Sequence, residues 1–78
     1  MLKFDDFTPT DEGIIVFKFT RKDSEKKEHM IKIQEKDGKF ILSIYKEGAR
    51  LEQIEKPSQY KTIDDVLVDA NKMYKLYY

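Results

Sequence analysis

The chain has 78 residues, no cysteine and a formal net charge of zero, from 15 basic and 15 acidic side chains. This length predicts one small domain, and the absence of thiols excludes disulfides and cysteine-ligated zinc. Neutrality, together with thirteen lysines to two arginines, argues against a duplex-DNA binder and against a dedicated phosphate-reading surface.

We expect neither a signal peptide nor a membrane-spanning segment. The first seven residues, MLKFDDF, lack a basic region followed by an apolar run, and the longest apolar run covers only residues 14–17. A helix that crosses a bilayer needs roughly 20 apolar residues. A cytoplasmic protein without a membrane partner is therefore predicted. Its Lys/Glu-rich composition would suit a bacterial or phage accessory protein.

Residues 1–12 are predicted to form an acidic N-terminal arm or a short edge strand. One lysine and four acidic residues give residues 1–13 a net charge of −3. Leu2, Phe4 and Phe7 could pair as a strand or pack as an arm. The segment TPTDEG that follows, residues 8–13, is typical of a loop.

Residues 13–20, GIIVFKFT, alternate as a β-strand does. The face predicted to meet the core holds Ile15, Phe17 and Phe19. The opposite face holds Ile14, Val16, Lys18 and Thr20. Residues 21–28, RKDSEKKE, are all polar and predict a solvated hairpin tip.

The pair Asp37-Gly38 is the clearest turn signal, because both central residues of a two-residue hairpin need positive φ. Such a turn sets the register of the strands on either side of it. The pairs expected on the core face are Ile33–Leu42, Ile31–Ile44 and Glu35–Phe40. Those expected on the outer face are Gln34–Ile41, Lys32–Ser43 and Met30–Tyr45.

Glu47-Gly48 suggests a second hairpin, whose last strand covers roughly residues 49–55 and ends before Pro57, which cannot donate to a ladder. A two-residue turn places Leu51 opposite Ile44 on the core face. On the outer face it places Arg50 opposite Tyr45 and Ile54 opposite Ile41. Glu52 is then the only acid expected on the outer face.

Residues 62–77 predict the helix, with Thr62 as N-cap and Asp65 three residues later as a variant of the capping box. Its apolar stripe comprises Ile63, Val66, Leu67, Ala70, Met73, Tyr74 and Tyr77. Val68, Leu76 and Tyr78 lie off this stripe. We expect Tyr78 to pack back on the sheet; otherwise it would join an interface.

The predicted fold is a single small α+β domain, residues 1–78, in which an antiparallel meander of about four strands, residues 13–56, packs one face against the C-terminal helix. The expected core consists of Ile15, Phe17, Phe19, Ile31, Ile33, Phe40, Leu42, Ile44, Leu51, Ile63, Val66, Leu67, Ala70, Met73 and Tyr74.

No pattern in the chain predicts catalysis, a cofactor or a metal site. His29 is the only histidine, and with charged neighbours we expect it to be solvated. Nucleophile-elbow, phosphate-loop and HExxH patterns are missing from the sequence. Adjacent acids such as Asp64-Asp65 point apart on a helix or strand, so adjacency does not bring them together. We therefore expect no enzyme.

The outer face of the predicted sheet carries more apolar groups than a solvated face normally does. Three interpretations compete: lysine stems or the N-terminal arm cover it, it binds another protein or a second copy as a homodimer, or it binds single-stranded DNA or RNA. A non-enzymatic protein-binding adaptor or regulator is the leading hypothesis, and single-stranded nucleic acid is the alternative. The residues expected to bind the partner are Tyr45, Arg50, Ile41, Met30, Lys18 and Lys32.

Overall fold

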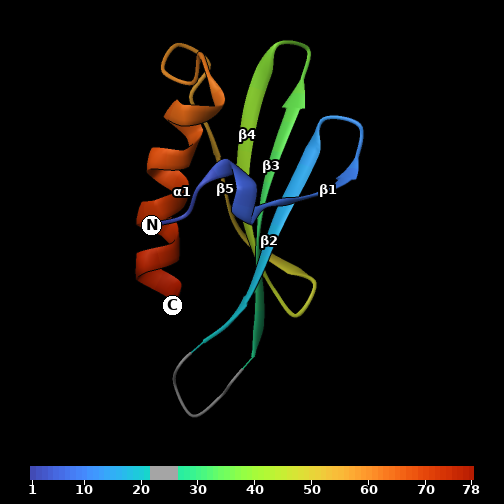
Figure 1. Cartoon of the computed structure of the whole chain (residues 1–78), viewed down its shortest axis with the longest axis vertical. Coiled ribbons are helices and arrows are strands. Elements are labelled where there is room, and N and C mark those ends of the chain that lie inside the picture. The colour runs from blue at the N-terminus through green and yellow to red at the C-terminus, as the bar shows by residue number, and fades with distance from the viewer. Residues whose placement is uncertain (22–26) are drawn as a thin grey trace.

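The computed structural model describes residues 1–21 and 27–78 and shows an antiparallel sheet followed by one helix (Figure 1). The elements are η1 (Phe4–Asp6), β1 (Thr8–Asp11), β2 (Ile14–Thr20), β3 (Glu28–Lys36), β4 (Lys39–Lys46), β5 (Ala49–Glu55) and α1 (Ile63–Tyr77). The strand order β1-β2-β3-β4-β5 follows the chain. The predicted α+β meander with one covering helix is confirmed. The predicted hairpin tip falls mainly on residues 22–26, which lie outside the described residues.

The described residues form a sheet of five strands, not the four expected, because the segment predicted as a loop forms β1. Thr8 faces Val16 and Pro9 faces Ile15 on β2. Proline is tolerated because β1 is an edge strand, where a missing N–H leaves the ladder to β2 intact. The composition of TPTDEG is typical of a loop, but edge strands accept such residues.

The turn between β1 and β2 depends on Gly13, which has a φ of +73°. A Cβ at this position would lie 2.7 Å from the carbonyl oxygen of Glu35 on β3. The carbonyl of Gly13 in turn accepts a hydrogen bond of 2.7 Å from the Glu35 N–H. The β1–β2 turn is therefore anchored to the next strand by a close backbone approach that only glycine permits.

The β3–β4 hairpin has the predicted register. Asp37 and Gly38 both have positive φ, at +54° and +73°, as this two-residue turn requires. The six predicted pairs are all present. Strand β4 therefore places its core and outer side chains as expected.

The β4–β5 hairpin departs from the prediction after its first two pairs. Tyr45 faces Arg50 as expected, but a one-residue shift then places Ile44 opposite Glu52 and Leu42 opposite Ile54. Leu51 is 46% exposed, whereas Ile54 packs against the core. The core assignment of Leu51 and the outer assignments of Ile54 and Glu52 were wrong, because a β-bulge changes the face of every later residue.

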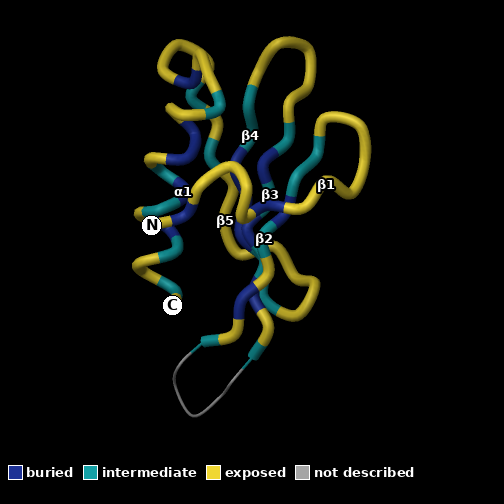
Figure 2. Tube along the Cα trace, viewed as in Figure 1, coloured by how far each residue is buried: buried dark blue, intermediate teal, exposed yellow. Residues whose placement is uncertain are grey.

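Helix α1 covers one face of the sheet, which we call the core face (Figure 2). Apart from Leu51, every residue predicted for the core is buried or partly buried there. Three buried residues that were not predicted join it, Leu2, Phe7 and Tyr60, and the partly buried Ile54 and Tyr77 pack against it. Aromatic rings meet edge to face across the layers, with Tyr74 of α1 5.6 Å from Phe17 and 5.0 Å from Phe19.

His29 is buried and not solvated as predicted, with an exposed fraction of 1%. Its ring stacks on Phe19 with 5.4 Å between centroids and lies 6.2 Å from the ring of Tyr77. Because a carbonyl oxygen only accepts, Nδ1 of His29 donates the 3.0 Å hydrogen bond to the oxygen of Lys27. Strand alternation places His29 on the same face as Ile31, and this signal outweighs its charged neighbours.

Both ends of α1 show the features predicted for them: a capping box at the start and packing of Tyr78 on the sheet at the end. The Thr62 hydroxyl accepts the Asp65 N–H at 3.4 Å, and the Asp65 carboxylate accepts the Thr62 N–H at 3.0 Å. Hydrogen bonds from the backbone of Thr62 and Lys61 lower the pKa of Asp65. At the other end, the Tyr78 ring lies 4.7 Å from that of Tyr74 and 6.1 Å from that of Phe19. The last residue packs back on the sheet, as expected.

The N-terminal arm lies on the helix side of the molecule (Figure 1). Leu2 is buried and hydrogen-bonded to Asn71 of α1, and the Phe7 ring is 5.9 Å from that of Phe17 on the core face. The arm therefore completes the core and leaves the outer face of the sheet uncovered. Within the described residues, no helix is both long and apolar enough to cross a membrane.

Candidate functional site

The outer face of the sheet, opposite α1, brings four of the six predicted partner-binding residues into one row. Lys18 on β2 faces Met30 on β3, Met30 faces Tyr45 on β4, and Tyr45 faces Arg50 on β5. Facing side chains in an antiparallel sheet have their Cβ atoms about 5 Å apart, so such a row forms one continuous strip. We call it the cross-strand row.

The other two predicted residues share this face but lie outside the row. Lys32 occupies the next row, opposite Ser43, and its Nζ lies 5.1 Å from the centre of the Tyr45 ring. Ile41 lies one row farther, opposite Gln34. The structure thus brings Lys32 onto Tyr45, whereas Ile41 is too far along the strand to belong to the same contact.

The middle of the outer face is closed by its own side chains. Val16 and Ser43 are 6% and 1% exposed, although no described helix or strand lies over them. Met30, Lys32 and Tyr45 are half-buried, and long side chains of this kind cover smaller neighbours with their stems. The interpretation that lysine stems cover this face is supported in part, while the alternative cover by the N-terminal arm is contradicted.

The outer face is cationic. On β1 to β5, its positions hold five basic and three acidic residues: Lys18, Lys32, Lys36, Lys39, Arg50, Asp11, Glu28 and Glu55. Along β5, Arg50 donates to the Gln53 side chain at 2.7 Å, and Gln53 donates to Glu55 at 3.0 Å. Because Gln53 is neutral, this contact orients Arg50 without neutralising its charge.

A second polar cluster, which sequence reasoning missed, joins the end of β5 to the helix. Asp69 accepts hydrogen bonds from the Lys56 ammonium at 2.8 Å and the Tyr60 hydroxyl at 2.6 Å. These two bonds lower the pKa of Asp69, while burial and the same carboxylate raise the pKa of Tyr60. Asp69 is thus held ionised and Tyr60 protonated. This arrangement suits a structural tie better than proton transfer near neutral pH.

No group of three or more His, Cys, Asp or Glu side chains in the described part of the chain could hold a metal ion. The neighbouring acids are used locally: Asp6 accepts the Lys3 N–H at 2.8 Å, and Asp65 caps α1. His29 lies buried among aromatic rings. Asp6, Asp65 and His29 therefore make local structural contacts.

An apolar groove beside α1 was also missed at the level of sequence, although two signals pointed to it. Val68 lies off the predicted apolar stripe and is exposed, and the N-terminal arm contains three large apolar residues. What the sequence could not show is that the arm would lie against α1.

Comparison with models of protein families, with curated proteins and with solved structures gave no match for this chain.

Proposed function

We propose that the protein is a small non-enzymatic adaptor or regulator that binds another protein through the outer face of its sheet. The observation that carries this proposal is the cross-strand row of Lys18, Met30, Tyr45 and Arg50 on a face over which no described helix or strand lies. Tyrosine, methionine and arginine are enriched in protein interfaces, and tyrosine and arginine often dominate the binding energy.

The contacts within the face favour a partner with acidic groups around an apolar centre. Lys32 lies over the Tyr45 ring, and such a cation–π contact is worth about 0.5–1 kcal/mol at an exposed site. An ordered tyrosine loses little conformational entropy on binding. Self-association through this face would bring together two surfaces that each carry a net positive charge, so a different protein is the better partner.

Single-stranded DNA or RNA is the alternative partner, supported by the cations Lys18, Lys32 and Arg50 around one aromatic ring. A strand-binding platform normally stacks successive bases on several rings. On the described strands this face offers Tyr45 alone, and Lys32 already lies over its ring. The protein partner is therefore the better supported of the two.

A capture experiment from a lysate of the source cells tests the proposal. The baits are the tagged wild type, Arg50→Glu, and Lys61→Glu as a control with the same charge change at an exposed position before α1. We expect a protein that survives nuclease treatment and binds wild type and Lys61→Glu equally. Binding to Arg50→Glu should be about tenfold weaker, equivalent to about 1.4 kcal/mol.

Equal capture by Arg50→Glu would show that the outer face is not the binding surface. Co-purified nucleic acid, with proteins lost after nuclease treatment, would instead favour the alternative. In that case the affinity for a labelled oligonucleotide should fall steeply with salt, because cations that contact phosphates release counterions. Urea denaturation of both variants provides the control for folding.

A further inference from the structure

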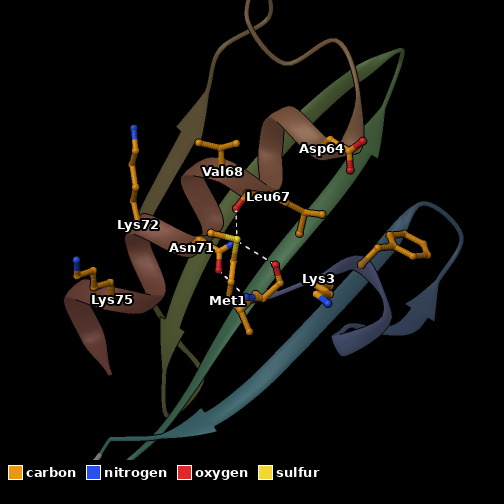
Figure 3. A pocket seen from close by; sticks show the side chains of 10 residues that line it. Met1, Lys3, Asp64, Leu67, Val68, Asn71, Lys72 and Lys75 are labelled. Carbon is orange, nitrogen blue, oxygen red and sulfur yellow. Dashed lines mark hydrogen bonds between the residues drawn. The ribbon is translucent and has the colours of Figure 1, made fainter.

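A groove of about 510 Å³ lies between α1 and the N-terminal arm, remote from the outer face of the sheet (Figure 3). Leu2 and Leu67 are buried and form its floor, whereas Met1, Phe4 and Val68 are each more than half exposed at its walls. This volume is within the usual range for small-molecule sites, which are mostly apolar with a few polar groups that fix orientation.

The uncharged polar side chain in the groove, Asn71, is fully occupied by internal hydrogen bonds (Figure 3). Its Oδ1 accepts the Leu2 N–H, and its Nδ2 donates to the carbonyls of Leu2 and Leu67 at 3.0 and 2.8 Å. The Lys3 N–H likewise donates a hydrogen bond of 2.8 Å to the Asp6 carboxylate. An extended peptide could not pair with the backbone of residues 2 and 3, so the occupant that suits this groove is an apolar chain.

The charges around the groove are unequal at its two ends. Lys72 and Lys75 lie toward the C-terminal end of α1, and Asp64 lies at its start, with Lys3 on the opposite wall (Figure 3). Lys72 is 3.7 Å from Asp69, but that carboxylate is already hydrogen-bonded to Lys56. One acid therefore serves two ammonium groups, and the Lys72 end retains positive charge.

We propose that this groove binds a long-chain carboxylate, such as a fatty acid. Its carboxylate lies at the Lys72–Lys75 end, away from Asp64, and its acyl chain lies on Leu67, Val68 and Leu2. The unbranched, flexible side chain of Met1 can close over the acyl chain. Charge complementarity sets the direction of the ligand, and burial of the acyl CH₂ groups against the apolar lining supplies most of the affinity.

The test uses dodecanoate below its micelle-forming concentration, titrated into the full chain by calorimetry and by amide NMR. We expect saturable binding of one ligand per chain, with shifts at residues 1–4 and 67–75. Val68→Gln should weaken binding about tenfold, because it places an amide on the apolar wall. Leu76→Gln is the matched control, since Leu76 is exposed on the same helix but does not line the groove.

A second variant separates the charge from the apolar contact. Lys75→Glu should weaken dodecanoate binding about fivefold and leave the binding of neutral dodecanol unchanged. The proposal is overturned if dodecanoate does not saturate, if Leu76→Gln weakens it as much as Val68→Gln, or if the shifts fall on the outer face. It is also overturned if sedimentation shows a dimer that Val68→Gln dissociates, because a second copy would then cover the groove.

Discussion

The hairpins β3–β4 and β4–β5 share a strand and a turn geometry, yet only one keeps a continuous register. In both, the two turn residues have positive φ. In β3–β4 the pairs run unbroken from Lys36–Lys39 to His29–Lys46, whereas in β4–β5 the register shifts after two pairs. Turn chemistry therefore determines the first pairs of a hairpin, and the burial of side chains decides the pairs beyond them.

Strands β3 and β5, which pair with β4 in these two hairpins, differ in the spacing of their apolar residues. Strand β3 carries Ile31 and Ile33 two residues apart, so a regular strand buries both. Strand β5 carries Leu51 and Ile54 three residues apart, and a regular strand would place them on opposite faces. The bulge exchanges their positions: Leu51 is exposed, and Ile54 packs against the core. It also places Lys56 within reach of Asp69 on the helix.

Truncation of one leucine in each hairpin should give the largest contrast. Leu42 has no exposed surface, and Leu42→Ala should lower the free energy of unfolding by about 2–5 kcal/mol through lost contacts and a cavity. Leu51→Ala should cost less than about 0.5 kcal/mol, as for most exposed sites. Urea denaturation measures both. A loss below half a kcal/mol for Leu42→Ala would mean that the face assignment is inverted.

The glycines of two turns should differ by a smaller amount. Gly13 and Gly38 have the same φ of +73°, so alanine at either position costs about 1–2 kcal/mol of backbone strain. A Cβ at Gly38 meets nothing within 4 Å, whereas at Gly13 it lies 2.7 Å from a carbonyl oxygen of β3. Gly13→Ala should therefore destabilise by at least about 1 kcal/mol more than Gly38→Ala. Equal losses in thermal unfolding would argue against the close approach to β3.

The contacts of Asp69 with Lys56 and Tyr60, which join the end of β5 to α1, should make the stability depend on pH. Asp69→Asn should cost about 1–3 kcal/mol at pH 7, because hydrogen bonds to a charged group are lost. The ammonium of Lys56, followed by the Tyr60 hydroxyl, lowers the pKa of Asp69 below 3.8. Its contribution is complete above that unfolded value and is lost as the pH falls through the folded pKa.

Wild type should therefore lose stability below about pH 4 more steeply than Asp69→Asn, as measured by urea denaturation between pH 2 and 7. Asp64→Asn, an exposed position in the first turn of the same helix, serves as the control and should follow the wild-type curve. Parallel curves for wild type and Asp69→Asn would remove Asp69 as the origin of this acid dependence.

The fold could be predicted where local signals agreed with burial. Asp37-Gly38 and the alternation around it gave every pair of the β3–β4 hairpin, and hence the positions of Met30, Lys32, Ile41 and Tyr45. Arg50 was placed correctly because it lies before the bulge. The contact of Leu2 with Asn71 joins residues 69 apart in sequence, and no local pattern encodes it. His29 was misplaced because its charged neighbours were given more weight than strand alternation.

Deletion of Leu51 should give the smallest effect that still tests the comparison, and deletion of Ser43 from the facing strand β4 is the control. Removal of Leu51 brings Glu52 next to Arg50, and both keep their present partners, Ile44 and Tyr45. The stability should then change by less than about 1 kcal/mol, since the deleted residue is the extra one of the bulge. Removal of Ser43 from β4, which has no extra residue opposite β3, would turn half of that strand to the wrong face. Equal destabilisation by both deletions, measured by urea denaturation, would mean that Leu51 holds the bulge in place and is not dispensable.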